Sequence, residues 1–378
     1  MRIGINAQLL STEPGYRQSG VSRYIERLLV TLPLVMGDED ELIVVRSRPF
    51  DGPDPESSPK ARFRDRVRRA FERPGLRAGW EQTLLPAQAF RLGVDLLHGP
   101  VNVVPILATC PLVVTVHDLA YLRMPEVVPA RRRQYFQAMT NVATRRADHV
   151  IAVSESTKAD IVELLGVKPE RITVTPLAAD ERFRPLPDAE VTAFRTGHGL
   201  ARPFALYLGN LEPRKNLPTL LRAFDQIAPD VEHDLVIVGG EGWMTEEFHA
   251  TLGSLRHRAR VRVHGFAPVE DLPAWYNAAD LFVFPSLYEG FGLPPLEAMA
   301  CGTPVVTANT SSLPEVVGDA ALTVAPSDTA ALAAAMGRVM GEPDLAASLR
   351  AAGLARAATF TWERSAAGTI DAYRAALT

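Results

Sequence analysis

Two carboxylates in the stretch YEGFGLPPLEAMACGTPVV, residues 288–306, have a spacing that suits a small ligand site. Glu289 and Glu297 lie eight residues apart, on either side of two glycines and a double proline. Proline is tolerated at the first helical positions and glycine favours the residue after a helix, so we expect a helix from Pro294–Pro295 to near Gly302. Glu297 then falls in the first turn, where a carboxylate complements the helix dipole or accepts hydrogen bonds from the vicinal hydroxyls of a ribose.

The loop before this helix has the features of an anion site. The preceding run LFVFPS predicts a strand that ends just before Glu289, and open α/β sheets bind ligands beyond the carboxyl ends of their strands. Gly290 and Gly292 would let the backbone approach a ligand closely. The amides of Phe291, Gly292 and Leu293 would then face a phosphate, with the helix N-terminus behind them.

A second cluster, LGNLEPRKNL, follows another predicted strand of the same region and contains Gly209, Asn210, Arg214 and Lys215. A diphosphate needs cationic partners, and two adjacent basic residues supply them without a metal. The alternative is an exposed loop that only precedes a helix. Taken together, the two clusters predict a cleft that binds a nucleoside diphosphate.

The elements around these clusters predict two α/β domains. Short apolar strands alternate with longer helical patterns along the 378 residues, which is typical of parallel sheets with right-handed crossovers. We expect two doubly wound Rossmann-like domains, residues 1–185 and 186–362, with a C-terminal helix at 363–378 that packs back on the first. Six strands are predicted in the first domain (RIGINA, ELIVVRS, DLLHG, LVVTVHD, HVIAVSE, ITVTPLA) and five in the second (FALYLGN, DLVIVGG, VRVHGF, LFVFPS, TPVVTA).

Composition narrows the class of protein. The net charge of −4 gives no case for nucleic-acid binding, but residues 1–185 hold 26 Lys and Arg against 22 Asp and Glu, while residues 186–378 hold 14 against 22. The first domain is therefore basic enough to meet an anionic surface. The two cysteines, Cys110 and Cys301, form no CxxC, which favours a reducing, cytoplasmic location. No apolar run is long enough for a transmembrane helix.

These motifs resemble those of the retaining glycosyltransferases of the GT-B fold, family four, and above all its mannosyltransferase-like members in polysaccharide biosynthesis. The E-x7-E element of that family matches Glu289 to Glu297, and its basic pair matches Arg214 and Lys215. GFAPVEDLPAWYNAADLFVFPS resembles its base-binding turn, which places Phe266 and Ala267 near the nucleobase.

In the first domain, YRQSGVSRYIERLL resembles the glycine loop that faces the donor diphosphate, at Gly20. VVTVHDLAY resembles the strand that delivers an active-site histidine, His117. Two departures are clear: Ser19 precedes Gly20 where many members have a second glycine, and Asn210 follows Gly209 where many have an arginine. The second departure shifts the cationic role to Arg214 and Lys215.

The resemblance implies transfer of a hexose, with mannose from GDP-mannose as the first choice, to a hydroxyl of a glycan or lipid-linked glycan, with retention at the anomeric carbon. Glu289 would position the sugar, and the cations and loop amides would stabilise the leaving diphosphate without a metal or other cofactor. A nucleotide-sugar epimerase or hydrolase of the same architecture, and a non-catalytic nucleotide-binding scaffold, are the alternatives.

Other charged segments have simpler interpretations. Asp38 and Asp40 form a D-x-D sequence that elsewhere holds a metal, but their polar surroundings favour a solvated turn. Residues 51–79 resemble an arginine-rich insertion, in which Phe63, Val67, Ala70 and Phe71 have roughly helical spacing. This insertion and Arg131–Arg133 are interpreted as solvated surface or, alternatively, as a peripheral contact with the anionic inner face of a membrane.

Overall fold

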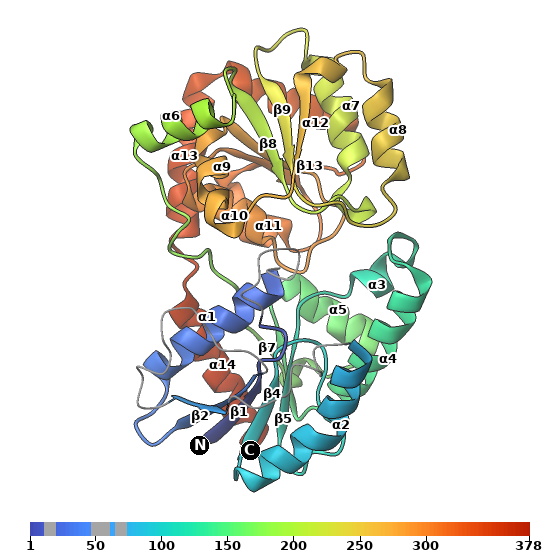
Figure 1. Ribbon diagram of the computed structural model, residues 1–378, viewed down its shortest axis with the longest axis vertical. Helices are drawn as coiled ribbons and strands as arrows, with labels where there is room; N and C mark the ends of the chain where they lie inside the picture. The colour runs from blue at the N-terminus through green and yellow to red at the C-terminus, as the bar shows by residue number, and fades with distance from the viewer. Residues whose placement is uncertain (11–19, 47–60, 65–73) are drawn as a thin grey trace. The chain divides into compact units, whose positions relative to one another are not determined.

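The computed structural model of the chain describes residues 1–10, 20–46, 61–64 and 74–378 (Figure 1). The chain divides into two units. Unit 1 comprises Met1–Leu177 together with Thr361–Thr378, and unit 2 comprises Ala178–Phe360. Each unit is an α/β structure built on one parallel sheet.

The sheet of unit 1 has seven strands in the order β3-β2-β1-β4-β5-β6-β7, and every pairing in it is parallel. The central strands β5 and β6 are buried at every residue and rich in Val, Ile and Leu, as expected for strands covered on both faces. The strands are β1 (Arg2–Asn6), β2 (Glu41–Val45), β3 (Ala61–Arg64), β4 (Leu96–Gly99), β5 (Leu112–Val116), β6 (His149–Ala152) and β7 (Ile172–Val174).

Helices cover both faces of this sheet (Figure 1). α1 (Gly20–Val35) packs against the C-terminal helix α14 (Trp362–Leu377) on one face. The other face is covered by α2 (Pro74–Arg91), α4 (Ala130–Arg146) and α5 (Glu155–Leu165), whose buried residues share one core with β4, β5 and β6. The short α3 (Ala120–Arg123) follows β5 and contacts α4.

Residues 51–79 are not simply an insertion between elements. Ala61–Arg64 forms strand β3, which pairs in parallel with β2 at the edge of the sheet, and α2 begins at Pro74. Phe63 therefore lies in a strand, so the predicted helical spacing that included it is wrong at that position. Val67, Ala70 and Phe71 lie outside the described residues.

The sheet of unit 2 has six parallel strands in the order β10-β9-β8-β11-β12-β13. Its last strand, β13, is not predicted from the sequence, because LTV is only partly buried and lies in an Ala-rich stretch without a Val or Ile run. The strands are β8 (Phe204–Leu208), β9 (Asp234–Val238), β10 (Val261–Gly265), β11 (Leu281–Phe284), β12 (Val305–Ala308) and β13 (Leu322–Val324).

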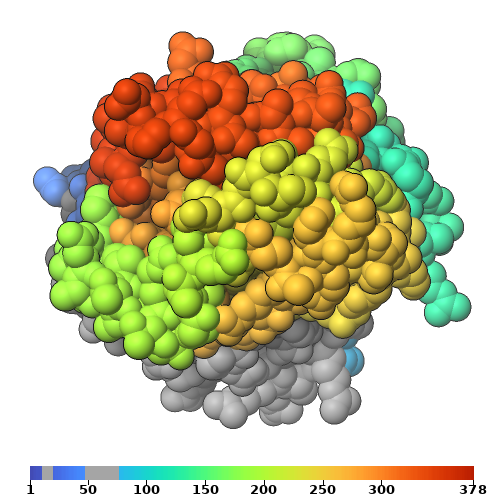
Figure 2. Space-filling model, turned by 90° about the horizontal axis from the view of Figure 1, so that it is seen from above, coloured from blue at the N-terminus to red at the C-terminus, as the bar shows by residue number. Residues whose placement is uncertain are grey.

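The helices of unit 2 form two groups on opposite sides of its sheet (Figure 1). One group packs α7 (Leu217–Ile227) between α8 (Glu246–Ser254) and α12 (Thr329–Gly341). The other joins α6 (Asp188–Gly197), α9 (Leu272–Ala278), α10 (Leu293–Ala300), α11 (Leu313–Val317) and α13 (Pro343–Ala357). Figure 2 looks onto unit 2 and shows the segment of α12 and α13, in red-orange, at one side and α6, in green, at the other.

Candidate active site

The two predicted clusters of unit 2 follow neighbouring strands. β8 pairs in parallel with β11, so the loops after both strands leave the same edge of the sheet. Arg214 and Lys215 lie in a single 3₁₀ turn, Pro213–Lys215, after β8. Glu289 lies in the loop after β11, and the backbone of Leu287 donates a hydrogen bond to the carbonyl of Arg214 at 2.8 Å. The sheet thus brings both clusters together.

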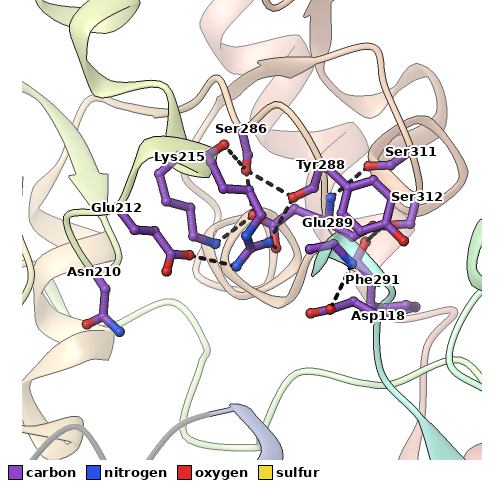
Figure 3. A network of polar contacts seen from close by, with 12 residues as sticks. Asp118, Asn210, Glu212, Lys215, Ser286, Tyr288, Glu289, Phe291, Ser311 and Ser312 are labelled. Carbon is purple, nitrogen blue, oxygen red and sulfur yellow. Dashed lines mark hydrogen bonds and ion pairs between the residues drawn. The ribbon is translucent and has the colours of Figure 1, made fainter. Parts of the chain in front are cut away.

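Glu289 bonds directly to the charged group of Lys215 (Figure 3) and also to that of Arg214. Arg214 Nη1 donates to Glu289 Oε2 at 2.8 Å, and Lys215 Nζ donates to Glu289 Oε1 at 2.6 Å. A second carboxylate, Glu212, accepts from Arg214 Nη2 at 2.7 Å. Lys215 also lies 4.9 Å from the centre of the Phe284 ring. Two cations are therefore matched by two anions in one compact network.

Glu289 is held ionised although it is buried. Burial alone would raise the pKa of its carboxyl, but Arg214 and Lys215 outweigh this effect, and with a hydrogen bond from Ser286 they lower the pKa to about 2. Ser286 Oγ donates to Glu289 Oε1 at 2.6 Å. Near neutral pH the site thus contains a negative charge, which accepts hydrogen bonds from Arg214, Lys215 and Ser286.

Two serines hold the backbone of the glutamate loop. Ser311 Oγ accepts from the amide of Glu289 at 2.8 Å. Ser312 Oγ lies within hydrogen-bond distance of two carbonyls, those of Glu289 at 2.9 Å and Phe291 at 2.6 Å. Both serines come from the segment after β12, so three loops of the sheet fix the position of one carboxylate.

The loop ends at the N-terminus of α10, which begins at Leu293, one residue before the predicted start. Gly292 takes a left-handed conformation with φ of 116°, and a Cβ there would lie 3.0 Å from Leu313 Cδ2. The amides of Phe291, Gly292 and Leu293 donate to no acceptor within the described part of the chain. A helix N-terminus with such amides favours an anion. The helix ends at Ala300, and Gly302 takes φ of 77° as the capping glycine.

Glu297 is placed differently from the prediction. Because α10 begins at Leu293, Glu297 is its fifth residue and lies in the second turn, so the helix-dipole interpretation is wrong. The side chain is 1% exposed, and Tyr276 Oη donates to its Oε2 at 3.1 Å. Tyr276, on α9, is itself fully buried. The carboxylate is therefore held in a fixed orientation from a neighbouring helix.

The predicted base-binding turn follows β10. Phe266 is 46% exposed, whereas the next residue, Ala267, is buried. Gly265 has φ of 85°, which turns the chain at the end of the strand.

The loop after β8, which begins at Gly209, contacts the loop after β9. Asn210 is exposed, and Gly209 precedes it at the end of the strand. A Cβ on Gly239 would lie 1.9 Å from the carbonyl oxygen of Gly209, so the loops after β8 and β9 touch through their backbones. This close approach explains Gly239 without a ligand.

In unit 1, the predicted histidine lies directly after β5. His117 Nε2 lies 2.8 Å from the carbonyl oxygen of Pro100, which can only accept, so the ring proton is on Nε2. Burial lowers the pKa of His117, which favours the neutral ring and leaves Nδ1 as an acceptor. Gly20 is the first residue of α1, while Ser19 and the rest of the glycine loop before it lie outside the described residues.

A chain of buried neutral groups stands behind this histidine. The ring of Tyr24, on α1, meets the His117 ring edge-on, with centroids 4.9 Å apart. Tyr24 Oη lies 3.0 Å from Thr115 Oγ1, and Thr115 lies 2.8 Å from His98 Nε2. The chain ends on α14, where Tyr373 Oη lies 2.8 Å from His98 Nδ1. Burial lowers the pKa of His98 to about 3, so this ring stays neutral.

The remaining candidates have local partners. Asp40 accepts from the amide of Gly37 at 3.0 Å and from the terminal ammonium at 2.7 Å, as expected for a turn. No group of three or more potential metal-binding side chains occurs in the ranges that the structure describes. Asp118, which follows His117, accepts a hydrogen bond from the amide of Ala120, the first residue of α3, at 3.1 Å. Arg131–Arg133 lie in the first turn of α4.

Several residues of the site were not identified from the sequence. Glu212 stands two residues before Arg214, and an acid so close to a basic pair was a signal that could have been used. Ser286, Ser311 and Ser312 carry no such signal, because serine is common in loops. His98 and Tyr373 are far apart in the chain, and only the packing of α14 joins them.

Solved structures with the same arrangement define the class of protein. Sucrose-phosphate synthase from Thermosynechococcus elongatus superposes with a TM-score of 0.77 over 99% of this chain and 98% of that chain, at 24% identity. The Anabaena protein HepE in complex with UDP-glucose superposes with a TM-score of 0.73, over 98% of this chain and 99% of that chain, at 22% identity. The fold is that of the GT-B glycosyltransferases.

Sequence comparison then gives the family. The family model described as Glycosyltransferase Family 4 matches residues 18–183, and that described as Glycosyl transferases group 1 matches residues 188–356. O-antigen chain mannosyltransferase B of Escherichia coli is 34% identical over 97% of this chain and 99% of its own length. The chain belongs to family 4 of the glycosyltransferases. None of its described helices has the length and apolar character needed to cross a membrane.

Proposed function

We propose that the protein transfers mannose from GDP-mannose to a hydroxyl of a glycan or lipid-linked glycan and retains the configuration of the anomeric carbon. The likeness to O-antigen chain mannosyltransferase B over nearly the whole chain supports the choice of sugar. The observation that carries the proposal is the position of Glu289 between Arg214 and Lys215, at the carboxyl ends of β8 and β11.

The basic pair stabilises the diphosphate. Lys215 Nζ has three N–H donors, of which one bonds to Glu289, so it can also bond to a phosphate oxygen. Arg214 is fixed by Glu212 and Glu289, which removes the cost of ordering a long side chain when the ligand binds. The amides of Phe291–Leu293 add donors from the helix N-terminus. These groups neutralise the charge that develops as the glycosidic bond breaks.

Glu289 positions the sugar. Its carboxylate is ionised, and it can accept hydrogen bonds from sugar hydroxyls while it stabilises the positive charge that develops on the anomeric carbon. Its position is set by the two cations, by Ser286 and by the serine contacts to its backbone. A fixed charge of this kind needs no reorganisation when the reaction occurs.

The nucleoside lies against the remaining residues of unit 2. Glu297, oriented by Tyr276, holds the ribose hydroxyls. The exposed ring of Phe266 and the backbone of Ala267 contact the base. Gly209 and Asn210 line the phosphate side of the same sheet edge.

Unit 1 supplies His117 and Gly20. With its proton on Nε2, His117 offers Nδ1 as an acceptor to a hydroxyl of the transferred sugar, and Gly20 presents the N-terminus of α1 to the donor. In the front-face reaction, the acceptor oxygen forms the new bond to the anomeric carbon on the side from which the phosphate leaves. The departing phosphate oxygen takes the acceptor proton, so no side chain has to act as a nucleophile.

The test is a donor screen followed by analysis of the product. We expect GDP and GDP-mannose to raise the melting temperature more than UDP and UDP-glucose do, since a ligand at about 100 times its Kd adds ~2.7 kcal/mol of stability. NMR of the product should show the same anomeric configuration as the donor. Transfer should persist in excess EDTA with at most a few-fold loss. An inverted product, a preference for UDP-glucose, or activity restored only by Mg²⁺ or Mn²⁺ would each refute its part of the proposal.

A further inference from the structure

Large apolar side chains gather on one surface of unit 1. Among the described residues, twelve large hydrophobic side chains are exposed, and seven of them lie on α2, on α4 or on the loop of residues 105–108. Phe90 on α2 is 76% exposed and Leu107 on the loop is 70% exposed. Single exposed apolar residues need no explanation, but a contiguous group indicates a surface that contacts something apolar.

Hydrogen bonds join the three segments into one surface. The amide of Ile106 donates to Gln82 Oε1 on α2 at 2.9 Å. From the other side, Arg146 at the end of α4 donates to the carbonyl of Ala108 at 2.7 Å. α2 and α4 also cover the same face of the sheet and share its core (Figure 1). The loop therefore lies between the two helices, and we name the three segments together the α2–α4 surface.

This surface is basic as well as apolar. α4 contains five arginines and no acidic residue, and the one acid of α2, Glu81, is buried and bonded to Asn6. The acids nearest along the chain lie outside the two helices: Asp95 follows α2, Asp148 follows α4, and Glu126 precedes α4. Exposed Tyr135 and Val142 lie on α4 between arginines at both ends of the helix.

The arginines at the start of α4 oppose the dipole of their own helix, although the guanidinium carbon of Arg132 lies 5.6 Å from the centre of the Phe136 ring. Positive charges in the first turn of a helix oppose its dipole, so Arg131–Arg133 lower rather than raise the stability of α4. Arg133 has one partner there, the carbonyl of Pro125 at 3.2 Å. Negative charges outside the protein would offset the unfavourable position of these arginines in the first turn. The exposed apolar side chains of the same surface would be stabilised by contact with an apolar layer. A lipid bilayer with anionic headgroups provides both.

We propose that the α2–α4 surface lies on an anionic membrane, with Phe90 and Leu107 inserted at the headgroup–acyl boundary and the α4 arginines against the headgroups. The surface would bring the protein to a lipid-linked acceptor, so this inference extends the proposed function. Lipid binding and sugar transfer are measured in separate experiments, so a negative result for one leaves the other proposal standing.

The binding experiment uses flotation of the full chain with vesicles. We expect binding to phosphatidylcholine–phosphatidylglycerol vesicles and little binding to pure phosphatidylcholine. Raising NaCl from about 0.1 M to about 1 M shortens the Debye length from roughly 10 Å to 3 Å and should weaken binding strongly. The double variant Phe90→Ser, Leu107→Ser should lose about 10-fold or more in lipid affinity. Arg131→Gln with Arg132→Gln should lose about 10- to 30-fold.

Matched controls come from the rest of the chain. Leu34→Ser removes a side chain that is also 70% exposed, but from α1. Arg338→Gln with Arg374→Gln removes two exposed charges elsewhere. Both controls should bind anionic vesicles like the wild type. All variants should transfer sugar to a water-soluble acceptor within about twofold of the wild-type rate, because exposed positions away from a site have small effects.

Three outcomes would overturn the inference. They are no binding to anionic vesicles, binding that does not depend on the anionic lipid, and equal loss of binding in the controls. A mass by light scattering that shows a dimer in the wild type and a monomer in Phe90→Ser, Leu107→Ser would assign the surface to self-association instead. Failure of transfer with intact vesicle binding would count against the proposed function and leave the lipid surface in place.

Discussion

In unit 2 the candidate site is held by ion pairs, whereas in unit 1 the side chains behind His117 are held by hydrogen bonds between neutral groups. Glu212, Arg214, Lys215 and Glu289 each lie against a side chain of opposite charge, and Arg214 and Lys215 lower the pKa of the Glu289 carboxyl. His98, by contrast, is buried where no charge can be compensated, and its pKa is about 3. The charged network of unit 2 suits its proposed role with the diphosphate, while unit 1 holds the His117 ring among neutral groups.

The strongest test of the charged network is Glu289→Gln. The change keeps the shape of the side chain and removes its charge, so kcat should fall about 100- to 1000-fold, the usual effect of losing one preorganised electrostatic contact. The affinity for GDP should stay the same or rise, because Arg214 and Lys215 lose a competing anion. Steady-state kinetics and calorimetry measure the two quantities. A large loss of GDP affinity with normal kcat would show that Glu289 serves only to position the cations.

The next test separates nucleoside binding from chemistry. Glu297→Ala should weaken GDP binding about 10- to 100-fold, since a hydrogen bond to a charged group contributes roughly 1.5–3 kcal/mol. Tyr276→Phe, which removes only the orienting hydroxyl, is the graded control and should cost less. Calorimetry that finds unchanged GDP affinity in Glu297→Ala would remove this residue from the nucleotide site.

The neutral network of unit 1 is tested by Tyr373→Phe. The variant leaves His98 Nδ1 buried without its partner, which should cost about 1–3 kcal/mol of unfolding free energy. The exposed Tyr135→Phe is the matched control and should change stability by less than about 0.5 kcal/mol. Urea denaturation gives the difference, and GDP binding should be unaffected in both variants. A stability equal to wild type would show that the bond to α14 contributes nothing.

The smallest expected effect is a dependence of stability on pH that distinguishes His98 from Glu289. The pKa of His98 is about 3 in the folded protein, so the unfolded chain binds the extra proton and stability falls as pH drops below about 6.5, by at most ~1.4 kcal/mol per unit. Glu289, with a pKa of about 2, loses its contribution only below about pH 4.5. Between pH 7 and 5, His98→Gln should therefore show a shallower decline of the urea midpoint than the wild type. Parallel declines would contradict this assignment.

The elements were predictable from the sequence where their patterns were long. α1 and α14 follow from apolar periodicity, and eleven strands follow from short apolar segments between turn residues, several of them continuous Val, Ile and Leu runs. β3 was missed because ARFR lies within an arginine-rich stretch that resembles solvated surface. β13 was missed because its three residues are only partly buried and stand among alanines, without the Val and Ile content of β7.

The site was predictable as a location and not as a set of contacts. In a parallel sheet, the loops after the strands all leave at the carboxyl ends of the strands. This places the loop of Glu289 at the same edge of the sheet as Arg214 and Lys215. The sequence does not show that these cations bond to the glutamate itself, because the direction of a loop side chain depends on contacts such as those of Ser311 and Ser312. The burial of Glu297 was also out of reach, since it depends on how α9 packs against α10.

The membership of α14 in unit 1 has a consequence for biosynthesis. Because Thr361–Thr378 follows all of unit 2 in the chain, the ribosome must make Ala178–Phe360 before the last helix of unit 1 exists. At about 5–20 residues per second, this delay lasts on the order of 10–40 seconds. During that time the face that α14 will cover, including His98, has no partner. Nascent unit 1 therefore leaves this face uncovered until Thr361–Thr378 has been made.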